Sequence, residues 1–335
     1  MIYRISVRDF RGIRSLDKPL EFSKHTIVIG PSGSGKTTLL ESLFMVPPIN
    51  VSIPLISVTK VDAIGKHRLC PSLVYRYHGV AKLWGELKGR GFEFLLKCDS
   101  REGWPEVSGM IGNTAVDLTR EALQDHEEVD EIIEKLELEL GVHPSSLSVY
   151  FPNDLRFLLM MEKELAREDK WVYVERSGLS VKVVQELVDK GSLSERYTDA
   201  TIRRSSIALR KETPRNVTYV YSFDLGEGLM RFLLGRMYLE LAKPSIVLWD
   251  VIEAGLSPPL IATLIDYLLS GDWQSVITTH SIDVLRHIAY TQKSGVKIVQ
   301  IHRGIDDTVK WKEFSVSELA ELLDKGIDPR RTIIS

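Results

Sequence analysis

Residues 30–37 constrain the fold of this chain more than any other segment. Their sequence, Gly-Pro-Ser-Gly-Ser-Gly-Lys-Thr, satisfies the phosphate-loop pattern G-x-x-x-x-G-K-[ST] at every fixed position. An apolar run at 26–29 precedes the loop, and an apolar helical pattern over 36–45 follows it. In a strand, glycine-rich turn and helix of this kind, backbone N–H groups and the helix N-terminus surround phosphate oxygens. The sequence therefore predicts a nucleotide-binding α/β fold.

Each loop residue has a predicted role in binding ATP and Mg²⁺, the two expected cofactors. Lys36 supplies positive charge to the β- and γ-phosphates, and the Thr37 hydroxyl can bind Mg²⁺. The other loop residues predicted to contact the nucleotide are Gly30, Ser32, Gly33, Ser34, Gly35 and Thr38.

Two further polar residues follow apolar strands late in the chain. Asp250 comes after the apolar residues 246–249 and is the predicted carboxylate partner of Mg²⁺. His280 ends the next predicted strand. Because the C-terminal ends of parallel strands lie on the ligand side of a sheet, we expect His280 in the same crevice as Asp250. There it can bond a γ-phosphate or a catalytic water.

The periodicity of the chain predicts an α/β architecture. Strands alternate with helices in the last third, which predicts a mostly parallel sheet covered on both faces. Alternating residues between 73 and 98 predict an antiparallel meander, and the pattern from 118 to about 211 is mostly helical. Predicted helices there cover 118–140 and 154–170, and residues 315–318 have the pattern of a capping box.

Composition excludes some classes of function. The formal net charge of −3 over 335 residues does not indicate a strongly basic nucleic-acid protein, although a local basic patch is compatible with it. The two cysteines, Cys70 and Cys98, form no metal-ligand pattern and suggest reduced thiols. Because no apolar run reaches membrane-spanning length and the N-terminus has no signal-peptide pattern, we expect no membrane partner and a cytoplasmic location.

Several segments together resemble the ABC-type ATPases of the RecF, SMC and OLD group. The matching segments are Asp-Phe-Arg-Gly-Ile at 9–13, the phosphate loop at 30–38, Asp-Leu-Gly-Glu-Gly at 224–228, residues 252–258, Thr-Thr-His-Ser at 278–281 and the ending at 318–330. The resemblance implies a P-loop NTPase with an ABC-type mixed sheet, an antiparallel β-subdomain and a helical insertion. It divides the chain into residues 1–115 and 216–335, which form the ATPase head, and a helical insertion at 116–215.

The same resemblance implies an ATPase that dimerises around ATP. Two ATP molecules would lie between two copies, each bound by one phosphate loop and the partner's signature loop. Additional nucleotide contacts would come from Arg11, Gly226, Glu227 and Gly228, and His280 would be the switch histidine. We expect a head without the nuclease domain of OLD nucleases, and with no long SMC coiled coil.

The chain departs from this group at three positions. The glutamate that normally follows the metal aspartate is replaced by Val251, which cannot accept a proton. Water activation then falls to His280, Glu253 or the substrate phosphate itself, and we expect slow hydrolysis. Gly226 stands where a signature-loop serine is common. Asn153 is the candidate substitute for the metal-sensing glutamine.

The sequence does not identify the molecule on which this protein acts. A basic segment made of Arg203, Arg204, Arg210, Lys211 and Arg215 is either a solvated surface or a DNA contact. Three functions are compatible with the residues: an ATP-driven switch acting on DNA or a partner protein, a nucleotide-sensing module with little hydrolysis, and the ATPase subunit of a defence or toxin-type system.

Overall fold

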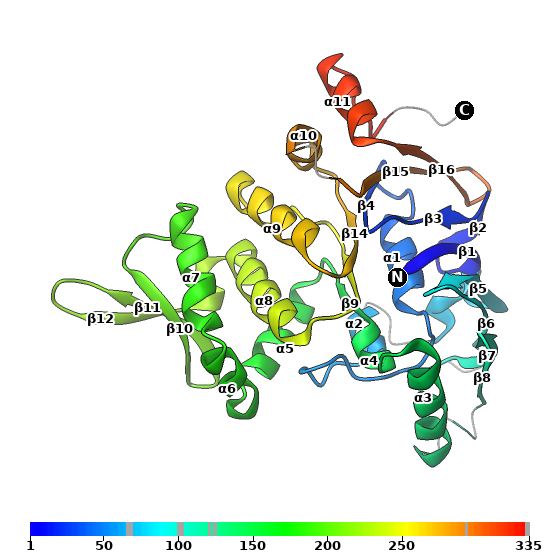
Figure 1. Cartoon of the computed structure of the whole chain (residues 1–335), viewed down its shortest axis with the longest axis horizontal. Helices are drawn as coiled ribbons and strands as arrows, with labels where there is room; N and C mark the ends of the chain where they lie inside the picture. Colours follow the sequence, from blue (N-terminus) through cyan, green and yellow to red (C-terminus); the bar gives the residue numbers. More distant parts are fainter. Residues whose placement is uncertain (65–69, 99–103, 120–121, 123–125, 292–293, 332–335) are drawn as a thin grey trace.

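The computed structural model describes residues 1–64, 70–98, 104–119, 122, 126–291 and 294–331. A 13-stranded mixed sheet forms the body, and a separate three-stranded sheet projects from it (Figure 1). The strand order in the large sheet is β8-β7-β6-β5-β1-β2-β16-β15-β4-β14-β13-β9, with β3 paired to β1.

The half of this sheet that contains β4 is parallel. Five neighbouring strands point the same way: β9 (Ser148–Phe151), β13 (Ile246–Trp249), β14 (Gln274–Thr278), β4 (His25–Ile29) and β15 (Val296–Arg303). All residues of the four strands from β9 to β4 are buried, as expected for parallel strands covered on both faces. Their C-terminal ends therefore lie together at one edge.

Helices connect and cover these strands. They are α1 (Lys36–Phe44), α8 (Glu227–Ala242), α9 (Pro258–Ser270), α10 (Ile282–Thr291) and α11 (Val316–Asp324). The helix α1 packs against β9, β13 and β14, and α11 packs against α10. The predicted capping box at Ser315 and Glu318 is confirmed, with both reciprocal bonds present at the start of α11.

The other half of the sheet is largely antiparallel. It contains β1 (Ile2–Phe10), β2 (Ile13–Leu16), β3 (Leu20–Glu21), β5 (Val80–Leu87), β6 (Arg90–Lys97), β7 (Glu106–Ile111), β8 (Thr114–Leu118) and β16 (Thr308–Phe314). The strand β16 pairs antiparallel with β15 and so joins the two halves. With the parallel half, this gives the α/β mixed sheet that the sequence predicted.

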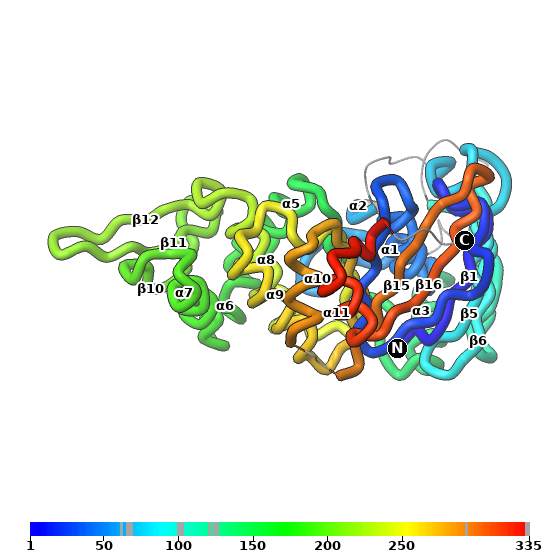
Figure 2. The backbone as a smooth tube through the Cα atoms, turned by 90° about the horizontal axis from the view of Figure 1, so that it is seen from above, coloured from blue at the N-terminus to red at the C-terminus, as the bar shows by residue number. Residues whose placement is uncertain are grey.

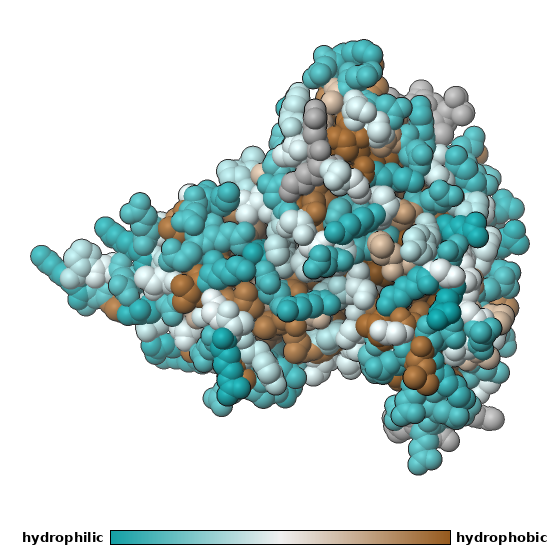
Figure 3. All heavy atoms as spheres, in the orientation of Figure 1, coloured by the Kyte–Doolittle hydropathy of each residue, from teal (hydrophilic) through white to brown (hydrophobic). Residues whose placement is uncertain are grey.

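The middle of the chain builds the projecting part. Further helical elements of the described chain are α2 (Lys60–Ile64), η1 (Cys70–Leu73), η2 (Tyr75–Tyr77), α3 (His126–Leu140), α4 (Pro144–Leu147), α5 (Leu155–Leu165), α6 (Glu168–Arg176), α7 (Leu179–Asp189) and η4 (Ser222–Leu225). Of these, α6 and α7 lie beside the projecting sheet, whereas α3 lies with the body (Figure 1). The second sheet consists of β10 (Tyr197–Arg203), β11 (Ser206–Glu212) and β12 (Val217–Tyr221). Figure 2 shows this sheet extending from the body along the long axis, and its tip is mainly hydrophilic in Figure 3.

Three local predictions were wrong. Residues 197–212 form strands rather than helix, because β10 and β11 pair with each other and α7 packs against β10. Helix α3 begins at His126, not at 118, because Leu118 pairs with Val107 in the β7–β8 hairpin. The predicted strand at 73–77 consists of 3₁₀ turns, η1 and η2.

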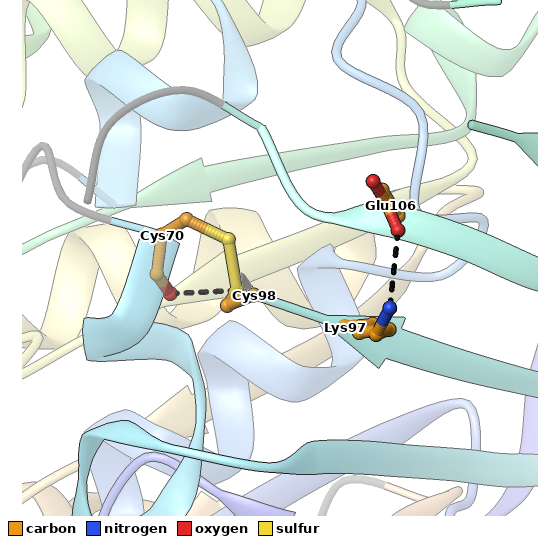
Figure 4. Close-up of a disulfide and its surroundings, with 4 residues drawn as sticks. All are labelled: Cys70, Lys97, Cys98 and Glu106. Carbon is orange, nitrogen blue, oxygen red and sulfur yellow. Dashed lines mark hydrogen bonds and ion pairs between the residues drawn. A yellow bond between two sulfur atoms is a disulfide. The ribbon is translucent and has the colours of Figure 1, made fainter. Parts of the chain in front are cut away.

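The two cysteines form a disulfide rather than the expected reduced thiols (Figure 4). Cys70 begins η1 and Cys98 directly follows β6, so residues 28 apart in sequence become neighbours through the antiparallel sheet. Beside the bridge, Lys97 pairs with Glu106 of β7. None of the described helices combines the length and the apolar character that a membrane-spanning helix requires.

Candidate functional site

The phosphate loop connects β4 to α1, and two of its glycines are required by the backbone. At Gly30 a Cβ atom would lie 2.3 Å from the Ile301 carbonyl oxygen. Gly35 has φ 99° and is the N-cap of α1, where no side chain accepts a hydrogen bond from the helix. The first N–H groups of α1 therefore face the loop without a side-chain partner, as an anion site requires.

Lys36 lies inside the loop. Its Nζ donates to the carbonyl oxygens of Gly30 and Pro31, at 2.9 Å each, and the residue is 5% exposed. Burial lowers the pKa of Lys36 to about 8, although Asp250 and Glu253 act in the opposite direction. The ammonium is thus held by neutral carbonyls in a partly desolvated position, where an anionic phosphate would be a stronger partner.

Thr37 and Asp250 meet as the sequence predicted. The Thr37 hydroxyl donates to Asp250 Oδ2 at 2.9 Å, and Thr278 of β14 donates to Asp250 Oδ1 at 2.7 Å. Thr278 also accepts the backbone N–H of Val251 at 2.8 Å. The sequence analysis did not identify Thr278, although its place at the end of a strand beside β13 was a signal.

This donor set fits Mg²⁺. A hydroxyl and a carboxylate converge, and both are oxygen ligands of the kind that Mg²⁺ prefers. Among the described residues, no group of three His, Cys, Asp or Glu side chains could hold a metal alone. A Mg²⁺ ion here would take its remaining ligands from phosphate and water.

Glu253 holds the backbone that carries His280. Its Oε2 accepts the Thr279 hydroxyl at 2.8 Å, and its Oε1 accepts the backbone N–H of His280 at 2.6 Å. The pKa of His280 is lowered, first by partial desolvation of the imidazole and then by the positive charge of Lys36. The negative charges of Glu253 and Asp250 act in the opposite direction. A neutral imidazole at pH 7 retains one nitrogen that can accept a proton.

Val251 occupies a strained backbone position directly after Asp250. Its φ is +51°, in the left-handed region that β-branched residues rarely adopt. The side chain has no acid or base. The only carboxylate within the next two residues, Glu253, already binds two donors.

Arg11 lies against the helix rather than the phosphate loop. Its Nη1 is 2.9 Å from Glu41 Oε1, and Glu41 is one turn beyond Thr37 in α1. The Arg11 backbone N–H donates to the Leu73 carbonyl at 3.0 Å. The predicted contact between Arg11 and the nucleotide would therefore require the Arg11 side chain to leave Glu41. The sequence alone did not point to Glu41.

The predicted signature loop lines a pocket at the start of α8. A Cβ atom on Gly228 would be 1.8 Å from the Gly255 carbonyl oxygen, so the start of α8 packs directly on the turn that follows Asp250. A pocket of about 570 Å³ opens there, lined in part by Gly226, Glu227 and Ser257. Both α8 and α9 begin at this pocket, and neither has a side-chain cap.

Asn153 also reaches the signature helix. It follows β9, which pairs with β13, so it lies at the same sheet edge as Asp250. Its Oδ1 accepts from Arg231 Nη2 at 3.3 Å, while Arg231 pairs with Glu227 at 2.8 Å. Arg231 is 1% exposed, and a charged residue within the apolar helix α8 was the available sequence signal.

The predicted basic segment lies on the projecting sheet. The Arg203 guanidinium stacks on the Tyr219 ring at 3.9 Å, and Lys211 lies 5.1 Å from the centre of the Tyr197 ring. Arg210 pairs with Glu212 at 2.7 Å. Arg204 is exposed in the β10–β11 turn, and Arg215 is exposed between β11 and β12.

Comparison with known proteins gives structural likeness only. No protein-family model and no curated protein matches the chain. Among solved structures, it is similar to the Smc head domain of Pyrococcus furiosus with an extended coiled coil bound to the C-terminal domain of ScpA. The TM-score is 0.56 at 13% identity, over 97% of this chain and 98% of that one.

A second solved structure, the SmcHead bound to the C-winged helix domain of ScpA, gives the same result. Its TM-score is 0.57 at 15% identity, over 97% of this chain and 99% of that one. At such low identities the two TM-scores show the fold alone, which is that of an SMC head domain: a large mixed sheet covered by helices, with a separate antiparallel sheet.

Proposed function

We propose that this chain is an ATP-binding, slowly hydrolysing molecular switch of the RecF/SMC-like group that dimerises around ATP and Mg²⁺. The observation that carries the proposal is the convergence of Lys36, Thr37 and Asp250 at the C-terminal ends of β4 and β13. Lys36 is positioned to receive phosphate charge, and Thr37 with Asp250 supplies the oxygen ligands of the metal. RecF- or OLD-like membership is part of this proposal and rests on the sequence motifs.

Dimerisation follows from the separation of the two half-sites. The phosphate loop offers backbone donors on one side of a bound γ-phosphate. The uncapped starts of α8 and α9 offer a second set, around a pocket that none of the phosphate-loop residues lines. A second copy would place its α8 N-terminus against the exposed side of the phosphate, because helix N-termini attract anions.

The proposed slow hydrolysis of ATP rests on the residues that follow Asp250. Val251 has no proton-accepting group, and Glu253 is engaged by Thr279 and His280. Loss of a positioned base lowers rates by about 10²–10⁴. This observation also favours a second candidate function, a nucleotide sensor that scarcely hydrolyses ATP.

Light scattering with and without ATP and Mg²⁺ tests the dimer. Ser257 is exposed at the pocket and makes no side-chain cap to α9, so Ser257→Tyr should obstruct closure without affecting folding. We expect the wild type to double in mass with ATP, and Ser257→Tyr to bind ATP as a monomer, with Ser257→Ala as the matched control. A monomeric wild type that binds ATP would contradict the dimer.

The projecting sheet is the proposed surface for DNA. Between residues 196 and 223 it carries six basic and two acidic side chains, against a net charge of −3 for the whole chain. Exposed arginines beside aromatic rings suit phosphate contact and base stacking. The two Smc heads described above are bound to a protein, so a protein partner is the alternative occupant.

Oligonucleotide binding at several salt concentrations distinguishes these partners. If DNA binds here, Arg204→Glu and Arg215→Glu should each reduce the salt slope of the affinity by about one. Lys135→Glu, on α3 at the other end of the molecule, is the charge-matched control (Figure 1). Equal binding by all variants would exclude this surface as the DNA site.

A further inference from the structure

The segment after α11 returns to the nucleotide site. Arg330 forms a two-point ion pair with Asp328, with Nε to Oδ1 at 2.8 Å and Nη2 to Oδ2 at 2.7 Å. The Arg330 backbone N–H donates to the same carboxylate at 3.0 Å. This local clamp fixes the direction of the guanidinium, because a fork of two parallel bonds has little rotational freedom.

The third nitrogen of this guanidinium, Nη1, reaches the loop that carries His280. Arg330 Nη1 donates to the backbone carbonyl oxygen of His280. On the other side of the same residue, the His280 N–H is held by Glu253 at 2.6 Å. The backbone of His280 is therefore bound at both ends by charged groups, one from the turn after β13 and one from the end of the described chain.

We propose that Arg330 is a positioning residue for ATP hydrolysis, which acts by fixing the backbone of His280 opposite Glu253. The inference rests on the proposed function and extends it, because it makes Asp328 and Arg330 part of the ATPase site. Arg330 touches the His280 carbonyl, not the reacting atoms, and its effect on the reaction passes through the imidazole. Small displacements of a catalytic group have large effects on rate.

The positive charge of Arg330 also affects the pKa of His280. The groups that act on the His280 imidazole are Lys36 of α1, Asp250 and Glu253 after β13, and Arg330 itself. Arg330 is among the causes that lower the pKa of His280, after burial and Lys36. Its removal should raise the pH at which His280 titrates.

The experiment compares Arg330→Ala, the conservative Arg330→Lys, and Arg331→Ala as a neighbouring control. Arg331 has a side chain that is 85% exposed and only a 3.8 Å contact to Asp328. In single-turnover hydrolysis we expect Arg330→Ala to be slower by about tenfold to a hundredfold. We expect ATP affinity to change by less than about twofold, partial recovery in Arg330→Lys, and no effect of Arg331→Ala.

The titration of the His280 ring, followed by NMR without nucleotide, separates positioning from a purely structural role. Its midpoint should move to higher pH in Arg330→Ala. Wild-type rates with an unchanged midpoint would overturn the inference, and so would a loss of ATP affinity as large as the loss of rate. If Arg330→Ala does not fold, Asp328→Asn weakens the same clamp, and a wild-type rate and midpoint there would overturn it equally.

The same titration distinguishes this inference from the proposed function. If the wild type binds no ATP, the proposed function fails. A raised His280 midpoint would in that case still establish the Arg330 contact, and an unchanged midpoint would remove it.

Discussion

Val251 is the residue whose replacement tests the proposed slow hydrolysis most directly. Val251→Glu places a carboxylate directly after Asp250, the proposed Mg²⁺ ligand, at the position where the RecF/SMC-like motif that the sequence resembles has its base. The position is fixed, because the Val251 N–H donates to Thr278 Oγ1 at 2.8 Å and Thr278 in turn donates to Asp250.

The size of the effect follows from this geometry. A positioned base contributes about 10²–10⁴ in rate, and we expect about tenfold to a hundredfold because only the backbone at 251, not the new side chain, is already held. Val251→Gln is the matched control. Both variants keep the strained φ of +51° and nearly the same volume, so only the proton-accepting group differs.

Phosphate release with enzyme in excess over ATP measures this difference directly. The expected order is Val251→Glu faster than wild type, and Val251→Gln equal to or slower than wild type. Equal rates for Glu and Gln would refute the reasoning. A wild-type kcat near the enzyme median of about 10 s⁻¹ would do the same, because such a rate needs a base that the structure does not offer at 251.

Gly228, Lys36 and Glu253 each provide a further test. Gly228→Ala should lower the free energy of unfolding by about 1–3 kcal/mol and Tm by several degrees, because its Cβ would meet the Gly255 carbonyl oxygen at 1.8 Å. Gly91→Ala is its control in calorimetry, since the nearest atom is 4.0 Å away, and equal effects would contradict the packing argument. ATP affinity should fall roughly tenfold between pH 7 and pH 9, because the pKa of Lys36 is lowered to about 8 and phosphate binds the ammonium form. If calorimetric titration shows the same ATP affinity from pH 7 to pH 9, Lys36 does not have a pKa near 8. Glu253→Gln should slow hydrolysis by less than about tenfold, since the amide oxygen still accepts one of the two donors, Thr279 Oγ1 or the His280 N–H. A loss of about 10² or more would instead identify Glu253 as the general base.

The sequence predicted the parts of the site that depend on local pattern. The phosphate loop, Asp250 and His280 each follow a short apolar strand, and parallel strands bring such ends to one edge. Lys36, Thr37, Asp250 and His280 therefore lie together as expected, with Glu253 binding the backbone of His280.

Contacts that depend on tertiary structure were outside the reach of the sequence. Arg330 lies 50 residues from His280, and Cys70 lies 28 residues from Cys98, so no local pattern connects either pair. The strand β11 carries three consecutive buried residues, Ile207 to Leu209, and this apolar run does not alternate as an exposed strand would. Pairing with β10 and β12 decided its conformation.

The central claim, that this chain binds ATP through its phosphate loop, is tested most directly by thermal unfolding of wild type and Lys36→Ala with ATP and Mg²⁺. At ATP concentrations 100-fold above Kd, binding to the native state alone stabilises by about 2.7 kcal/mol. The Lys36 side chain is desolvated and, in the part of the chain that the structure describes, donates to oxygens of the phosphate loop alone, so its removal should leave the fold intact. We predict a clear ATP-dependent rise in Tm for the wild type and none for Lys36→Ala. An equal rise in both proteins, or no rise in the wild type, would contradict the account.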